Sequence, residues 1–183
     1  MALRQVILTV LTRGRMTGYE ITRNFDDVLS YFWRASHQQV YRELAGLSED
    51  GCVTCEVVSQ AGKPDKKVYG LTKTGKEELR RWVAEPTEPP RPQYDLLVKL
   101  LAAHAVDKNS LRQEIARVRA ESAGILKQFR AMKRECLRQP IDKRPEYEQT
   151  LYLVLRRGLL LAQAHVAWLG EVSEYLETGR LKK

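Results

Sequence analysis

The sequence predicts a mainly α-helical protein with one small β-hairpin, built as two parts joined by a proline-rich connector. Three observations lead to this fold class. Short helical patterns and one pair of alternating strand patterns fill the first half. The stretch EPTEPPRP, with Pro86, Pro89, Pro90 and Pro92, cannot continue a helix. Two long helical patterns with few turn residues fill the second half.

Composition narrows the class of protein further. Of 183 residues, 43% are hydrophobic and 30% are charged, which excludes a disordered chain and a membrane-spanning one. The apolar run Val6 to Leu11 is too short for a signal-peptide core, and no apolar stretch approaches the roughly 20 residues that span a bilayer. Three cysteines suit a reducing compartment. We therefore expect a cytoplasmic protein.

The first two predicted helices are short. Leu3 to Leu11 has apolar residues at helical spacing, and Arg13-Gly14 ends it. Thr17 is a suitable N-cap for the second helix. The apolar residues of that helix fall on one face, at Ile21, Phe25, Val28 and Leu29.

The third helix carries the sharpest local signal. Ser36 and Gln39 have the spacing of a capping box, in which each side chain bonds the other residue's backbone N–H. Gly51 ends the helix. Its buried stripe is expected to consist of Val40, Leu44 and Leu47.

A strand pair follows the third helix. Val53 to Val58 alternates as a strand, residues 61–65 form the turn, and Lys67 to Leu71 return. Thr72 then caps a fourth helix that runs through Leu79 and Trp82 to the prolines, with Trp82 expected in the core. Three helices followed by a hairpin is the order of a winged helix-turn-helix.

The exposed face of the third helix has the chemistry of base recognition. If its apolar stripe is buried, a turn of about 100° per residue places Gln38, Arg42, Ala45 and Glu49 outside. Gln and Arg have bidentate geometry for adenine and guanine edges, and an exposed Ala can meet a thymine methyl. Solvated surface residues are the ordinary alternative for each one.

Neighbouring residues are suited to phosphate contacts. Tyr41 and Gln39 flank the exposed face and can reach the DNA backbone. Lys63, Lys66 and Lys67 in the wing turn would add affinity with little sequence discrimination. The net charge of +8 agrees with a polyanionic partner, although the first 92 residues contribute only +2 of it. The prediction therefore depends on position and not on bulk charge.

Several segments of the first half closely resemble the PadR family of bacterial transcriptional regulators. They are GYEI (18–21), FWRASHQQVYRELAGLSEDGCV (32–53) and GKPDKKVYGLTKTGKEEL (62–79). The second half resembles, by length and pattern, the helical domain of the subgroup related to virulence-gene activators. The resemblance implies a homodimeric repressor that some small aromatic or hydrophobic compounds release from DNA. It implies DNA contacts from Tyr19, Ser36, His37, Gln38, Gln39, Tyr41 and Arg42, with the wing lysines on phosphate.

The second half predicts two long antiparallel helices. A heptad-like seam runs through Leu111, Ile115, Val118, Ser122, Ile125, Phe129, Met132 and Cys136. The second helix carries Leu155, Leu159, Ala162, Val166 and Leu169, which we assign to dimerisation because two helices alone bury too little apolar surface. The predicted parts are a DNA-binding domain (1–85), a linker (86–92) and a helical dimerisation and effector domain (93–183).

Alternatives were weighed against this interpretation. Cys52 and Cys55 have a zinc-like or redox spacing but lack a second close pair of ligands, so we expect no metal and no cofactor. Trp168 is a candidate effector contact. No nucleophile elbow, phosphate-binding Gly loop or HExxH motif is present, so an enzyme is not expected. The second hypothesis is a helical sensing protein whose winged domain binds protein and not DNA.

Overall fold

The computed structural model describes residues 2–26, 33, 35–60, 62–87 and 94–181. By its internal contacts the chain divides into two compact units, Met1–Pro90 and Arg91–Lys183. None of the described helices is both long enough and apolar enough to cross a membrane.

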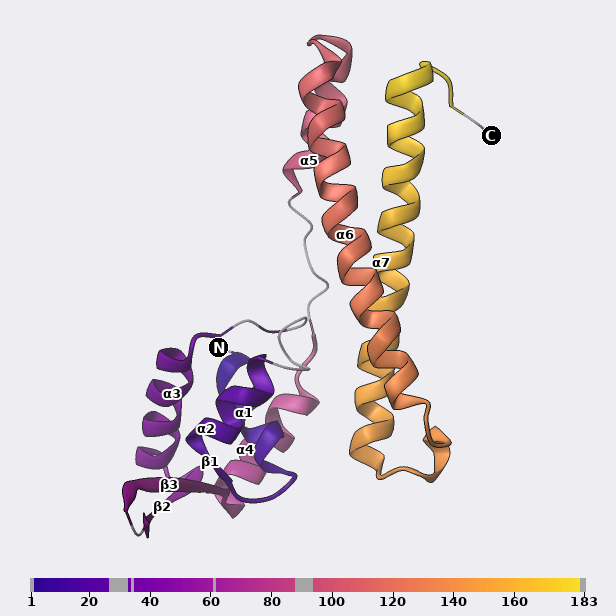
Figure 1. Cartoon of the computed structure of the whole chain (residues 1–183). Helices are drawn as coiled ribbons and strands as arrows, with labels where there is room; N and C mark the ends of the chain where they lie inside the picture. The colour runs from indigo at the N-terminus through magenta and orange to yellow at the C-terminus, as the bar shows by residue number, and fades with distance from the viewer. Residues whose placement is uncertain (1, 27–32, 34, 61, 88–93, 182–183) are drawn as a thin grey trace. The chain divides into compact units, whose positions relative to one another are not determined.

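The first unit holds four helices and three strands among its described residues (Figure 1). The helices agree with the sequence prediction to within a few residues at their ends. Val28 and Leu29, predicted on the second helix, lie outside the described residues. In chain order the elements are α1 (Ala2–Leu11), β1 (Met16–Thr17), α2 (Gly18–Asp26), α3 (His37–Glu49), β2 (Val53–Gln60), β3 (Lys63–Leu71) and α4 (Lys73–Ala84).

The strands form one antiparallel sheet in the order β1-β3-β2. The short strand β1 was not predicted, because two residues carry no readable alternation; Met16 pairs with Tyr69 and Thr17 with Val68. The hairpin turn is also shorter than predicted. Lys66 and Lys67 belong to strand β3, opposite Val58 and Val57, and not to the turn.

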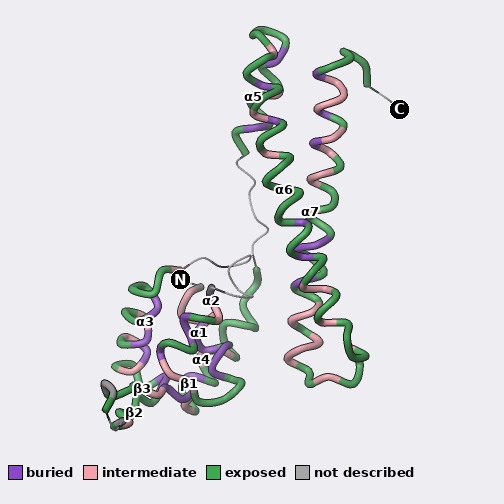
Figure 2. The backbone as a smooth tube through the Cα atoms, in the orientation of Figure 1, coloured by how far each residue is buried: buried purple, intermediate pink, exposed green. Residues whose placement is uncertain are grey.

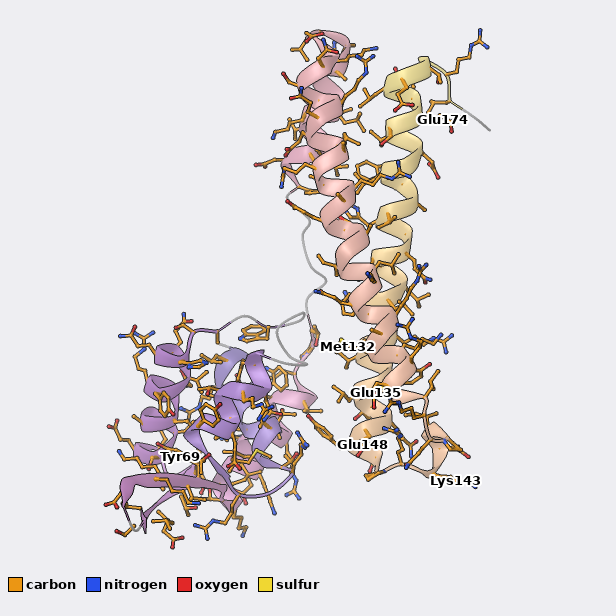
Figure 3. All side chains as sticks on the ribbon, in the orientation of Figure 1. Tyr69, Met132, Glu135, Lys143, Glu148 and Glu174 are labelled. Carbon is orange, nitrogen blue, oxygen red and sulfur yellow. The ribbon has the colours of Figure 1, made fainter. Side chains whose placement is uncertain are left out.

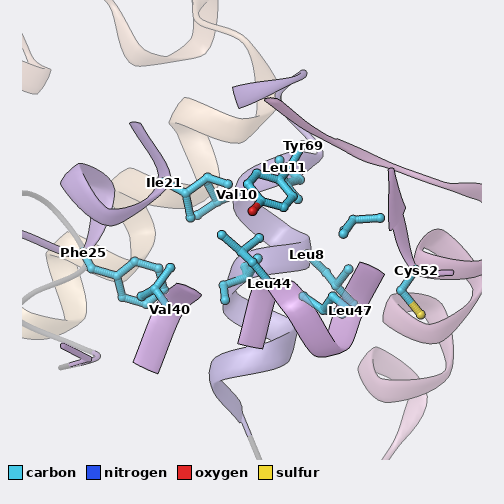
Figure 4. Packing of buried hydrophobic residues seen from close by; sticks show 12 residues of the cluster. Leu8, Val10, Leu11, Ile21, Phe25, Val40, Leu44, Leu47, Cys52 and Tyr69 are labelled. Carbon is cyan, nitrogen blue, oxygen red and sulfur yellow. The ribbon is translucent and has the colours of Figure 1, made fainter. Parts of the chain in front are cut away.

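The core of the first unit gathers side chains from α1, α2, α3 and the sheet (Figure 4). Val40, Leu44 and Leu47 are completely buried, as their spacing predicts. Cys52 is buried with them, whereas Trp82 is 41% exposed and does not pack in the core, contrary to the prediction. The helix period places Trp82 one residue beyond the inward face that carries Leu79.

The second unit is a pair of long helices with a short helix against one end. The helices α6 (Lys108–Cys136) and α7 (Glu146–Thr178) lie side by side, and the turn η3 (Ile141–Lys143) joins them (Figure 1). The sequence prediction omitted α5 (Asp95–Leu101) and the following turn η2 (Ala102–His104). Leu96 of α5 and Ala103 pack with Leu111 and Leu169 in one buried cluster.

The seam of α6 departs from the predicted heptads in its middle. Ile125 is 43% exposed and Leu126 is 6% exposed, so Leu126 takes the inward place assigned to Ile125. A helix with 3.6 residues per turn drifts out of a strict 3.5-residue repeat, and the 18 residues from Leu111 to Phe129 make about five turns. Figure 2 shows the resulting spaced buried positions along both helices.

The residues of α7 assigned to dimerisation are largely used inside the chain. Leu155, Leu159 and Leu169 are 2%, 7% and 0% exposed within a single chain, and Ala162 and Val166 are half-buried. They therefore offer little surface to a second chain. Neighbouring apolar residues on α7 do face outward, namely Leu153, Val154, Leu160 and Leu161.

Candidate nucleic-acid interface

The start of helix α3 is held by the predicted capping box. The Ser36 hydroxyl accepts from the Gln39 backbone N–H at 3.2 Å, and Gln39 Oε1 accepts from the Ser36 N–H at 2.8 Å. These bonds satisfy two polar groups that a helix N-terminus otherwise leaves unpaired. Because Gln39 Oε1 is occupied, only its amide nitrogen is available for a phosphate. The cap thus orients the first turn of α3.

The opposite side of α3 from its buried stripe is exposed. His37, Gln38 and Arg42 are all exposed, and within the described parts of the chain no carboxylate pairs with Arg42. Gln38 and Arg42 are one turn apart on this surface. A free amide and a free guanidinium at that spacing can each form two parallel hydrogen bonds to a base edge.

Two tyrosines border this exposed face. Tyr19, on the first turn of α2, is 65% exposed, and Tyr41 on α3 is 46% exposed. The Tyr41 ring lies so close to Gly18 that a Cβ there would overlap it. Gly18 therefore permits α2 and α3 to approach, and the contact fixes where the Tyr41 hydroxyl lies. The sequence alone gave no sign of this pairing.

The start of α2 is also closed by a reciprocal pair. Glu20 accepts from the Thr17 N–H at 2.7 Å, and the Thr17 hydroxyl accepts from the Glu20 N–H at 3.2 Å. The bonds from Thr17 lower the pKa of Glu20, and the charge of nearby Lys66 lowers it further. Lys66 on β3 thus lies near α2. Both Lys66 and Lys67 are exposed, and the Lys63 side chain lies outside the described structure.

A buried ionic network ties α1 to the end of α3 and to α4. Arg4 Nε donates to Glu78 Oε1 at 2.6 Å, and Arg4 Nη1 lies 2.8 Å from Asp50 Oδ2. The Cys52 thiol donates to Glu78 Oε2 at 3.1 Å. The Arg4 hydrogen bond lowers the pKa of Glu78, and burial raises the pKa of Cys52. A thiol held protonated in this way is a poor nucleophile and a poor metal ligand.

The side chains weighed for metal chemistry do not meet. Cys52 is buried and Cys55 is exposed on β2. No group of three or more His, Cys, Asp or Glu side chains with metal-binding geometry occurs in the described ranges. Tyr69, labelled in Figure 3 on β3, stands opposite Cys55, and burial followed by the Cys55 contact raises the pKa of Tyr69 to about 12.

Trp168, the predicted effector contact, belongs to a small aromatic group in the second unit. Its ring stacks on His165 with 5.7 Å between centroids. The Tyr94 hydroxyl lies 3.3 Å from His165 Nε2. Trp168 is half-buried against the cluster that contains Leu169. Tyr94 and His165 were not singled out from the sequence, because they are 71 residues apart.

A capped helix with an exposed Gln and Arg, beside a basic wing, defines a winged-helix DNA-binding protein. Comparison with known proteins places it more narrowly. Residues 7–81 match the "Transcriptional regulator PadR-like family", and residues 93–177 match the "Virulence activator alpha C-term" family. A probable transcriptional regulator of Mycobacterium tuberculosis, Rv1176c, is 36% identical over 192 residues, covering 98% of this chain and all of that protein.

Solved structures agree over the whole chain. The Vibrio cholerae virulence activator AphA has a TM-score of 0.82 at 33% identity, covering 97% of this chain and 99% of that one. Bacillus subtilis PadR bound to operator DNA has a TM-score of 0.84 at 26% identity, covering 96% and 99%. PadR has also been solved with p-coumaric acid, at a TM-score of 0.80, 25% identity, and 97% and 99% coverage.

The reading-head half is the more similar to the Bacillus protein. The negative transcriptional regulator PadR of Bacillus subtilis is 42% identical over 81 residues, which are 44% of each chain. The chain belongs to the PadR-like family of transcriptional regulators, as its sequence motifs indicate. It is a DNA-binding transcriptional regulator and not an enzyme.

Proposed function

We propose that this regulator is a homodimeric, sequence-specific repressor that binds a pseudo-palindromic operator and that a small aromatic or hydrophobic effector releases. The observation that carries the proposal is the exposed face of α3. Gln38 and Arg42 lie outside while Val40, Leu44 and Leu47 are fully buried on the other side of the same capped helix. Such a helix can enter a major groove without losing any core contact.

We assign the surrounding residues to positioning. Tyr19, Ser36, His37, Gln39 and Tyr41, all on or next to the first turns of α2 and α3, would contact backbone phosphates. Lys66 and Lys67, exposed on β3, and Lys63 before them would contact phosphates beside the wing. Only Gln38 and Arg42 would select bases.

Dimerisation is supported by the second unit's exposed apolar side chains. Leu153, Leu160 and Leu161 on α7 are 63%, 55% and 53% exposed. A contiguous exposed apolar surface of this kind marks an association site. A two-fold dimer would present two copies of α3 to half-sites about 34 Å apart, one helical turn of DNA.

Repression and release are supported by the Bacillus relative, a negative regulator also solved with p-coumaric acid. In this chain the aromatic group of Tyr94, His165 and Trp168 offers stacking surfaces for an aromatic effector. An effector that prefers one dimer geometry would lower DNA affinity by shifting the population away from the DNA-bound form.

The test begins with selection of bound sites from a random DNA pool and continues with two variants. Arg42→Ala should cost about 1–3 kcal/mol on the selected site and relax its preference at one base pair. Lys66→Ala should weaken all duplexes similarly, because it removes a phosphate contact. Binding is measured by fluorescence anisotropy over a range of salt concentrations. If Arg42→Ala changes neither affinity nor preference, the assigned reading face is wrong.

A further inference from the structure

A concave site in the first unit is separate from the exposed Gln38 and Arg42. It encloses about 660 Å³ between three helices, a volume within the range of small-molecule pockets. Helix α1 contributes Arg4 and Gln5, α3 contributes Glu43, and α4 contributes Glu78 and Trp82. Three elements that build the winged domain thus meet at one cavity.

The cavity is acidic within a chain of net charge +8. Three carboxylates, from Glu43, Glu78 and Glu85, line it against the guanidinium groups of Arg4 and Arg81. The charge of Arg4 is already neutralised by Glu78 at 2.6 Å and by Asp50 at 2.8 Å. Glu43 Oε1 lies 3.8 Å from Arg4, beyond hydrogen-bond distance. Its carboxylate therefore has capacity for another cation.

An unused acceptor lies at the same place. The Gln5 side-chain oxygen Oε1 is buried, and no donor among the described residues reaches it. A buried carbonyl oxygen without a hydrogen bond is unfavourable, because it has lost its water and gained no partner. A ligand that brings an N–H group would remove this cost. The vacant acceptor thus favours a hydrogen-bond donor over an acceptor.

Trp82 adds an aromatic wall. The sequence predicts this side chain in the core, yet it is 41% exposed and borders the cavity. The face of an indole ring attracts organic cations more strongly than the other aromatic side chains do. Carboxylates, an unpaired amide oxygen and an indole together form the donor set that recognises a flat, positively charged nitrogen group.

We propose that this cavity binds a small aromatic cation, an amidine or amine, with its ring against Trp82. Its positive group lies between Glu43 and Glu85, and one N–H donates to Gln5 Oε1. Because Glu43 directly follows Arg42 on α3, occupancy of the cavity alters the helix that contacts bases. Cation binding and operator binding are therefore coupled, through a site distinct from that of Trp168.

The test uses the full chain and benzamidine as the probe, with benzoate as a control of the same ring size and opposite charge. Binding is followed without DNA, by calorimetry and by the indole N–H resonance that the Trp82→Leu variant lacks. We expect saturable binding of benzamidine and none of benzoate. Glu43→Gln and Trp82→Leu should each weaken it at least tenfold, with the far-ultraviolet circular dichroism unchanged.

The matched control is Glu77→Gln. This carboxylate is also on α4, but it is not in the cavity and lies 4.0 Å from Lys73. Its loss should leave benzamidine affinity unchanged. Equal binding of benzoate, no saturable binding of benzamidine, or undiminished binding by Glu43→Gln would each overturn the proposal. Since these measurements contain no DNA, they are independent of whether α3 reads an operator as proposed.

The coupling is tested separately with the selected operator. Saturating benzamidine should change the operator dissociation constant several-fold in the unmodified chain. In Glu43→Gln the change should disappear, because the cation no longer contacts α3. An operator affinity indifferent to benzamidine in the unmodified chain would refute the coupling.

Discussion

Arg4 shows how one side chain can hold three helices of the reading head together. It contacts Glu78 on α4, Asp50 at the end of α3 and, at 3.8 Å, Glu43 on α3. Its own pKa is raised chiefly by the Glu78 hydrogen bond, so it remains charged at any ordinary pH. The partner carboxylate, and not Arg4, therefore sets the pH dependence of this contact.

Glu78 should make the reading head sensitive to acid. The Arg4 hydrogen bond lowers the pKa of Glu78 in the folded chain below its unfolded value. The stabilisation is therefore complete above the unfolded pKa, near 4.3, and is lost as pH falls through the lower folded pKa. Urea unfolding at pH 7 and at pH 3 should show a smaller loss of stability in Glu78→Gln than in the unmodified chain.

Glu77→Gln serves as the neighbouring control for that experiment. Glu77 is half-exposed and only weakly paired with Lys73, so its loss should leave the acid dependence as it was. If Glu78→Gln and the unmodified chain lose the same stability between pH 7 and pH 3, the Arg4 contact does not hold the carboxylate ionised.

At the scale of elements, the pairing of α6 with α7 depends on one glycine. A Cβ on Gly158 would come within 2.9 Å of the Phe129 ring, which is itself buried. Gly124 on α6 has nothing within 4 Å of the corresponding position. The two glycines therefore differ in kind: one makes room for a neighbour, and the other is a plain interruption of helix propensity.

This difference gives a paired prediction. Gly124→Ala should raise stability by about 0.5–1 kcal/mol, because alanine loses less backbone freedom in a helix. Gly158→Ala should instead lower it, since displacing a packed Phe ring costs about 1–3 kcal/mol. Thermal unfolding of both variants measures this. An increase in melting temperature for Gly158→Ala would mean that Phe129 moves aside without cost.

At the scale of the whole molecule, the second unit divides its apolar residues between two tasks. One set, including Leu155, Leu159 and Leu169, is buried within the chain. Another set on α7, including Leu160 and Leu161, is exposed. The first set stabilises the helix pair, and we propose that the second set binds a second copy of the chain.

Replacing Leu160 and Leu161 together by Glu should therefore abolish dimers while leaving the helices folded. Light scattering coupled to gel filtration measures the mass, and circular dichroism measures helix content. Leu159→Glu is the contrasting control and should unfold the helix pair, because a charge would be buried at a site only 7% exposed. A Leu160/Leu161 variant that still forms dimers would place the interface elsewhere.

What the sequence by itself determined here was local. The Ser36–Gln39 cap and the buried Val40, Leu44 and Leu47 follow from spacings of three and four residues, which a helix brings together whatever surrounds it. Signals from such short spacings predicted α3, its exposed Gln38 and Arg42, and the hairpin after it. The long PadR-like segments gave the family for the same reason.

The tertiary structure decided which side chains meet across distant segments. Strand β1 exists only because β3 lies beside it, and Tyr41 meets Gly18 only because α2 and α3 pack closely. Leu126 faces inward in place of Ile125, and Trp82 borders a cavity in place of the core. These outcomes depend on where neighbouring elements lie, and the periodicity of a single segment contains no information about its neighbours.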